Sequence, residues 1–472
     1  MRPSESPAGG RFPGAGLSQT VAIMLERTSR YLVLALMLSP AAAFAQGAAG
    51  AAVMRLSLRD AASIALAPAG NPRVQLAREL ITQARARAAE ARAALLPNLS
   101  AAVVDQSQTR NLEAFGLRLN IPLPGFAFPV KAGPFTVFDA RATASQTVLN
   151  LGSIRRYQAS RAGVLQAEAE SEGARDAVRA AVSRAYFAAL RALAVLDAAE
   201  ANVRLAEAVL RLAEDQKAAG TGTGIEITRA GVRLADQKQR RLAAQNGLTA
   251  AHLQLLRAMN LDLDVRLELA DSLAFAPIPA TTLEQALHEA LELRSDWQAE
   301  QKRLETARLQ QSASRLDRLP SVSLFADYGT IGSGIDSCFP TRTYGIAVQV
   351  PVFDGGRVDA RRAQSASQYR QEAIRSEDLR AQIELEIRLA LDGLQSSADQ
   401  VKTAEEGLVL AENEVAQAER RYRAGASPGI ELTDAQSRLE RARENRISAL
   451  FGYNLARIDL AVAMGTIRRI TE

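Results

Sequence analysis

Residues 146–152 read QTVLNLG, and residues 349–355 read QVPVFDG. Each stretch closes a run of alternating polar and apolar residues and precedes a long segment without proline. Two further pairs recur in the same order: LPNLS at 96–100 with LPSVS at 319–323, and AGTGTGIEIT at 219–228 with AGASPGIELT at 424–433. Ordered recurrence of turn residues indicates an internal duplication. We therefore predict two structural repeats, residues 46–277 and residues 278–472.

Each repeat is expected to contain two strands. Alternation with a period of two is clear at 138–148, 321–328 and 343–350. Residues 98–110 alternate poorly, and this strand is inferred from its counterpart in the second repeat. Strands of about ten residues are long enough to cross a bilayer when they are tilted.

Long helices are expected after the strands, at 153–219 and 356–424, and each would be roughly 100 Å long. Apolar residues recur seven apart along the second segment, at Ile387, Leu394, Val401, Leu408, Val415 and Tyr422. This spacing is typical of coiled-coil packing, with a simple helical bundle as the alternative. Shorter helices are predicted before the strands, at 58–95 with a break at 68–72, and at 283–317.

The first 45 residues have the three parts of a secretory signal peptide. Arg27 and Arg30 form the charged region, residues 31–38 are apolar, and Ala43-Phe44-Ala45 is a small-x-small cleavage site. A start at Met24 would give a signal of ordinary length. An uncleaved anchor is the alternative, but the apolar run is short for a membrane helix.

Composition argues against several classes of function. Two histidines and one cysteine leave little material for a His/Cys metal site or a histidine-based catalytic triad, and one cysteine cannot form a disulfide within the chain. The net charge is +5, without a run of Lys or Arg that would indicate nucleic-acid binding. We expect no enzyme activity, no metal and no cofactor.

If the chain crosses a membrane, it must do so with its strands, because no second apolar run approaches the ~18 residues of a membrane helix. Unpaired backbone groups are costly in hydrocarbon, and the smallest single-chain barrels have about eight strands. Four strands per chain therefore require oligomerisation. Three copies would supply twelve strands, with the long helices continuing as a cylinder.

The chain resembles the TolC-like outer membrane efflux proteins over about residues 56–467. The resemblance depends on paired segments, ALLPNLS with RLPSVS, and on PVFDGG at 351–356, RYRAG at 421–425, and LARIDLA at 455–461 with GTI at 465–467. It implies a mainly α fold with membrane β, in which a trimeric 12-stranded barrel continues into an α-helical coiled-coil tunnel. The implied location is the outer membrane of a Gram-negative cell, with the helices in the periplasm.

The resemblance also implies the partners and the function. The chain would be a passive homotrimeric conduit in outer membrane lipid, docked by a periplasmic adaptor (membrane fusion protein) and an inner membrane pump to expel small molecules. Type I protein secretion and metal efflux remain alternatives, and a periplasmic adaptor protein is a less favoured one.

The turns near 220–226 and 425–431 are the expected tip of the tunnel. Gly220 and Gly425 suit left-handed helix ends, and Thr223 or Ser427 can cap the next helix. By the family match, Glu431 and Asp434 would form an acidic constriction, and Glu226 would join this gate and bond Tyr422. The alternative is that these acids only stabilise the N-terminus of the next helix, by interacting with the helix dipole. The residues expected to dock the adaptor are Gly220, Thr223, Gly224, Ile225, Gly425, Ser427, Pro428, Gly429 and Ile430.

Cys338 is expected in an extracellular loop, and a longer loop is expected at 111–134.

Overall fold

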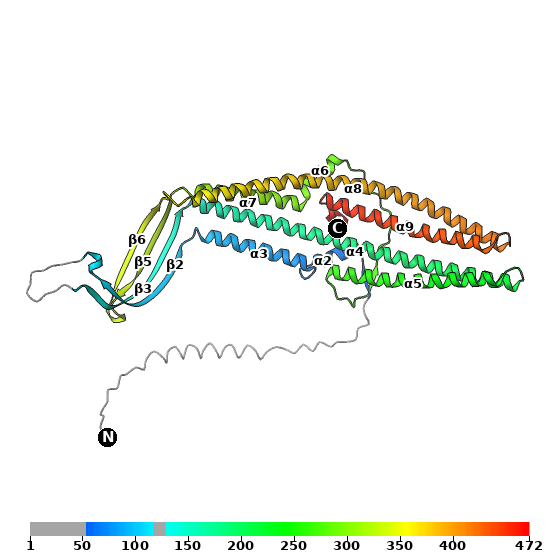
Figure 1. The fold of residues 1–472 in the computed structure, drawn as a ribbon, viewed down its shortest axis with the longest axis horizontal. Helices are drawn as coiled ribbons and strands as arrows, with labels where there is room; N and C mark the ends of the chain where they lie inside the picture. Colours follow the sequence, from blue (N-terminus) through cyan, green and yellow to red (C-terminus); the bar gives the residue numbers. More distant parts are fainter. Residues whose placement is uncertain (1–52, 117–128, 472) are drawn as a thin grey trace, which may run out of the picture. The chain divides into compact units, whose positions relative to one another are not determined.

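The computed structural model describes residues 53–116 and 129–471. The predicted signal peptide lies outside these residues, as does the middle of the loop predicted at 111–134. The described chain is mainly helical, as predicted, and contains one four-stranded sheet and one two-stranded sheet (Figure 1). Within the described ranges, each helix is too short or too polar to cross a lipid bilayer.

The four-stranded sheet is antiparallel, in the order β2-β3-β5-β6. Its strands are β2 (Asn98–Asn111), β3 (Lys131–Leu149), β5 (Ser321–Gly332) and β6 (Cys338–Gln349). All four predicted strands are present, and β3 starts seven residues earlier than the alternation indicated. Cys338 is not in the loop, because it begins β6 and lies opposite Gly332.

The two faces of this sheet differ. Cross-strand register places one set of mostly apolar side chains together: Leu99, Ala101, Val103, Ala142, Ala144, Val322, Leu324, Ala326, Tyr328, Tyr344, Ile346 and Val348. Tyr344 and Ile346 are 80% and 69% exposed in the single chain. On the opposite face, Arg141 contacts Asp139 at 2.5 Å and Asp327 at 3.7 Å. One face of the sheet is therefore mostly apolar, whereas the other carries these charged residues together with apolar ones such as Val104, Phe325 and Ile331.

Two long helices leave the sheet, α4 (Leu151–Ala218) and α8 (Arg357–Arg423), and each returns as a shorter helix, α5 (Gly224–Met259) and α9 (Gly429–Ala463) (Figure 1). The bounds of α4 and α8 agree with prediction to within two residues. Most of the predicted heptad positions are buried, including Ile387, Val401, Val415 and Tyr422. The two hairpins pack through α4 and α9.

Shorter helices precede the strands. The first is broken as predicted, into α2 (Leu58–Leu66) and α3 (Pro72–Ala93), where Asn71 caps α3 and Pro72 needs no amide donor. The second is also broken, into α6 (Leu283–Leu293) and α7 (Ser295–Leu316), which the sequence did not predict.

Tertiary contacts explain this second break. Arg294, between α6 and α7, is extended (φ −66°, ψ 121°) and 8% exposed. Its guanidinium donates to Glu386 of α8 at 2.6 Å and to the Ala463 carbonyl of α9 at 3.1 Å. These partners are far away in the sequence, and no local proline or glycine marks the position.

A core lies where the hairpins, α2 and the two-stranded sheet meet. β1 (Met54–Leu56) pairs in parallel with β4 (Leu267–Leu269), and α10 (Ile467–Thr471) packs against α2, α4 and α9. Tyr186 of α4 is fully buried, and its hydroxyl donates to Asp271 at 2.7 Å and lies 3.0 Å from the Leu56 carbonyl. Burial, and then the bond to Asp271, raise the pKa of Tyr186.

Short 3-10 helices, Glu113–Phe115 and Ile335–Ser337, lie in the loops at the other end of the strands.

Candidate functional site

The two hairpin turns end their long helices in the same way. Gly220 and Gly425 have φ of +77° and +67°, as their sequence context predicted. In the first turn the Gly220 amide donates to the Lys217 carbonyl and the Thr221 amide donates to the Gln216 carbonyl. The second turn has the same pair of bonds, Gly425 to Tyr422 and Ala426 to Arg421. This is the Schellman arrangement, which satisfies the last carbonyls of a helix.

The returning helices begin differently. Thr223 is the N-cap of α5, and its amide donates to Glu226 Oε2 at 3.1 Å. Ser427 does not cap α9, contrary to the prediction, because Pro428 is the N-cap residue and forms no side-chain cap bond. The Ser427 hydroxyl is buried without a hydrogen-bond partner among the described residues. Glu226 therefore has a local role at the N-terminus of α5, in the capping box with Thr223.

Tyr422 and Glu226 come together against Gly429. A Cβ atom on Gly429 would lie 3.2 Å from Tyr422 Cε2 and 3.4 Å from Glu226 Oε1. Tyr422 is 4% exposed and packs against Leu432 in the apolar cluster between the hairpins. Its carbonyl accepts from Gln216 Nε2 of the other hairpin at 2.9 Å. Burial, and then the charge of Glu226, raise the pKa of Tyr422. Among described residues the Tyr422 hydroxyl makes no hydrogen bond to Glu226.

Glu431 and Asp434 are each paired with an arginine of the same hairpin. Glu431 Oε1 lies 3.5 Å from Arg421 Nη1. Asp434 Oδ2 lies 2.6 Å from Arg438 Nη2, and Arg438 also contacts Glu414 at 2.9 Å. The sequence did not single out Arg438, because an (i, i+4) pair on an exposed helix is common, or Arg421, because it pairs with Glu431 across the turn. The two acids are therefore partly neutralised in the single chain.

A second contact between the hairpins lies further from the turns. Glu440 of α9 is buried, and its Oε2 accepts from Arg233 Nη2 of α5 at 2.5 Å and from Gln237 Nε2 at 3.3 Å. Arg240 of α5 contacts the other Glu440 oxygen. The sequence carried one signal of this contact, a glutamate next to Leu439 on the buried side of α9.

Exposed apolar side chains lie beside the charged residues of the turns. Ile225 and Ile430 are 57% and 61% exposed at the start of the returning helices. In the described part of the chain, no three His, Cys, Asp or Glu residues are grouped so that they could hold a metal ion. Acids, arginines and one buried tyrosine surround the turns, and the hydrogen bonds and ion pairs described above that join the hairpins all involve side chains.

Comparison with known proteins gives the class. Residues 64–261 and 286–466 match the family described as outer membrane efflux protein. The chain belongs to this family, and it is an outer membrane channel for export. The fold and the family are those of passive channels.

Individual relatives agree with this class. The chain is 28% identical to the pyoverdine export outer membrane protein OpmQ of Pseudomonas putida, over 82% of this chain and 81% of that protein. It is 22% identical to the proteases secretion protein PrtF of Dickeya chrysanthemi, over 69% and 72%. Among solved structures, the Campylobacter jejuni CmeC outer membrane channel is similar with a TM-score of 0.73 at 18% identity, covering 87% of this chain and 85% of that one.

Proposed function

We propose that three copies of this chain close their sheets into one twelve-stranded barrel in the outer membrane. The observation that carries the proposal is the two-faced sheet with two open edges. β2 and β6 each pair on one side only, and unpaired edge groups would be costly in hydrocarbon. Pairing β6 of one copy with β2 of the next satisfies both edges and closes the barrel.

The faces of the sheet support this orientation. The exposed apolar residues, such as Leu99, Tyr344 and Ile346, would contact lipid. Arg141, Asp139 and Asp327 would line the lumen. The strands are 12 to 19 residues long, which exceeds the ~9–11 residues that a tilted membrane strand needs.

The helices then form a periplasmic conduit without enzymatic chemistry. We propose that a periplasmic adaptor and an inner membrane pump dock at the hairpin turns, through the residues predicted for this role in the sequence. The exposed Ile225 and Ile430 support a docking role. Of the two relatives compared, the more similar one by identity is a pyoverdine exporter, so we propose small molecules as the cargo, with protein secretion as the second candidate.

We propose that Glu431, Asp434, Glu226 and Tyr422 form the constriction at the turns. Three-fold symmetry would bring three copies of each acid to one axis, where they would favour cations. Arg421 and Arg438 would moderate this effect, because each lies beside one of the acids.

We also propose that the chain is a duplication with repeats at 46–277 and 278–472. The element order supports it, because broken helix, two strands, long helix, turn and returning helix occur twice. One chain then supplies two of the six hairpins of the trimer.

Two neighbouring substitutions on β6 test the membrane proposal. Ile346→Lys places a charge on the proposed lipid face, at a cost of about 2–4 kcal/mol per copy near the bilayer centre. Ala347→Lys places the same charge on the opposite face of the strand. We expect Ile346→Lys to abolish trimers in the outer membrane fraction and Ala347→Lys to retain them. Equal assembly of the two variants, or a soluble periplasmic monomer for the unaltered chain, would refute the proposal.

A further inference from the structure

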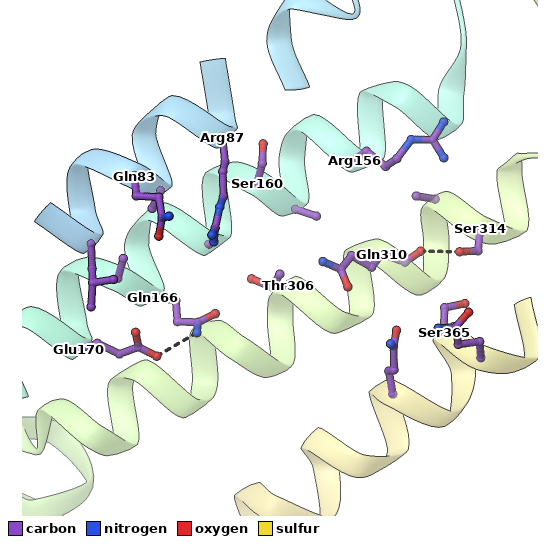
Figure 2. A pocket seen from close by; sticks show the side chains of 18 of the residues that line it. Gln83, Arg87, Arg156, Ser160, Gln166, Glu170, Thr306, Gln310, Ser314 and Ser365 are labelled. Carbon is purple, nitrogen blue, oxygen red and sulfur yellow. Dashed lines mark hydrogen bonds between the residues drawn. The ribbon is translucent and has the colours of Figure 1, made fainter. Parts of the chain in front are cut away.

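The helical wall next to the sheet has a groove that no role described above explains. Its volume is about 840 Å³, and it is lined by four helices, α3, α4, α7 and α8. Figure 2 shows the side chains that line it, among them Arg87 from α3, Arg156 from α4 and Gln310 from α7. Since the helices pack side by side in this order, a groove that touches all four lies on the concave face of the wall.

This concave face continues along α4. Ser160, Gly163 and Ala167 line the groove, and the residues four heptads further on, Ala188, Arg191 and Val195, line a second groove of about 550 Å³ with α5 and α9. A coiled-coil helix keeps residues seven apart on one face. Both grooves are therefore on one side of α4, which would face the lumen in the proposed trimer.

The charges in the first groove are mostly positive. Arg87, Arg156 and Arg361 face one acid, Glu170. Glu170 already accepts from Gln166 at 2.9 Å and from Arg303 at 2.8 Å, so its charge is compensated locally (Figure 2).

Two of these arginines share one carboxylate. Asp317 lies 2.8 Å from Arg156 and 3.3 Å from Arg361. Each guanidinium has five N–H donors, and only some of them are used in the contact with Asp317. Arg156 and Arg361 are 45% and 48% exposed. Arg87 has no ion-pair or hydrogen-bond partner among the described residues, so donors from all three remain accessible.

Neutral donors complete the lining. Gln83, Gln364 and Gln368 also line the groove, and their side chains have no hydrogen-bond partner in the described chain. Further towards the turns, the groove between α8 and α9 contains Asp392 and Asp399 and no basic residue. The second groove has Arg191, Arg240 and Arg443, but these are offset by Glu440 and Glu444, so the excess of basic over acidic residues is larger in the groove near the sheet.

We propose that this arginine groove is a cargo-contact site that favours small oxygen-rich anions, such as carboxylates, phenolates or sulfonates. The site rests on the proposed function, because the trimer would place three such grooves around one lumen. Guanidinium groups bind oxyanions with charge-assisted, often bidentate hydrogen bonds. A concave wall of one charge sign also raises the local concentration of counter-ions.

Binding of pyranine, a trisulfonated fluorescent anion, tests the site. The full-length processed protein in detergent would be titrated and followed by fluorescence anisotropy at low ionic strength. The double variant Arg87→Gln with Arg361→Gln should weaken binding by about tenfold, since each partly exposed contact contributes a few-fold. The matched control is Arg161→Gln with Arg370→Gln, which changes exposed arginines of α4 and α8 that do not line the groove.

A variant that is expected to strengthen binding distinguishes loss of the site from loss of folding. Asp317→Asn removes the competing carboxylate, and we expect it to tighten pyranine binding. Unchanged binding in both the double variant and Asp317→Asn would overturn the proposal, as would equal losses in the double variant and its control. The mass of the complex, measured on the same samples, separates the two proposals. A trimer without arginine-dependent binding refutes only the groove, whereas a monomer with such binding refutes only the assembly.

Discussion

Glu440 gives the sharpest prediction about opening of the conduit. It joins the two hairpins of one chain through Arg233 and Arg240, and its side chain is 7% exposed. Glu440→Gln keeps the shape of the side chain and removes its charge. Breaking a fully buried pair costs about 3–5 kcal/mol, and an exposed pair contributes about 0–1 kcal/mol. Because Arg233 is 21% exposed and Arg240 is 50% exposed, we expect a loss of about 1–2 kcal/mol.

The loss converts directly into gating if the contact exists only while the hairpins are together. A change of 1.4 kcal/mol shifts the ratio of open to closed channels by about tenfold. Single-channel recording in planar bilayers would measure the open probability of Glu440→Gln. Glu444→Gln is the matched control, since Glu444 lies one turn further along α9, is exposed, and makes no ion pair in the described chain. Identical open probabilities for wild type, Glu440→Gln and Glu444→Gln would refute this reasoning.

Three further predictions concern the turns. The double variant Glu431→Gln with Asp434→Asn should raise single-channel conductance and weaken block by divalent cations; no change in either would remove these acids from the constriction. The raised pKa of Tyr422 means that its neutral form stabilises the arrangement of the turns described above, and this contribution is present below pH ~10 and lost as the pH rises above it. Conductance should therefore rise above about pH 10 in wild type but not in Tyr422→Phe, and an equal rise in both would contradict the assignment. Gly425→Ala should cost about 1 kcal/mol because φ is +67° and should speed proteolysis at the turn, whereas Gly407→Ala inside α8 should not.

The regular elements could be predicted from the sequence because their signals are local and repeated. The heptad pattern through Ile387 and Val415 gave α8 to within one residue. Alternation placed β5 and β6, although β6 begins at Cys338, where no alternation is visible. The weakest strand, β2, was recovered only because its counterpart was readable.

The remainder depends on contacts between distant segments. The break at Arg294 follows from Glu386 and the Ala463 carbonyl, which are about 90 and 170 residues away in the chain. At the candidate site, the sequence predicted the left-handed glycines because turn geometry requires them. It could not predict which arginine would pair with Glu431, since the flexible side chains around a turn have several geometrically suitable partners.

The shared face of α4 limits how this protein can change in length. Inserting a single residue would rotate every later side chain by about 100° and would turn positions that face the lumen in the proposed trimer into the packing seam. Inserting seven residues preserves the face and lengthens the helix by about 10 Å. Since α4 and α8 have 68 and 67 residues and both pack against α9, a change in one must be matched in the other and in both returning helices. The length of the conduit is therefore expected to change by whole heptads, inserted or deleted together in the two long helices and the two returning helices.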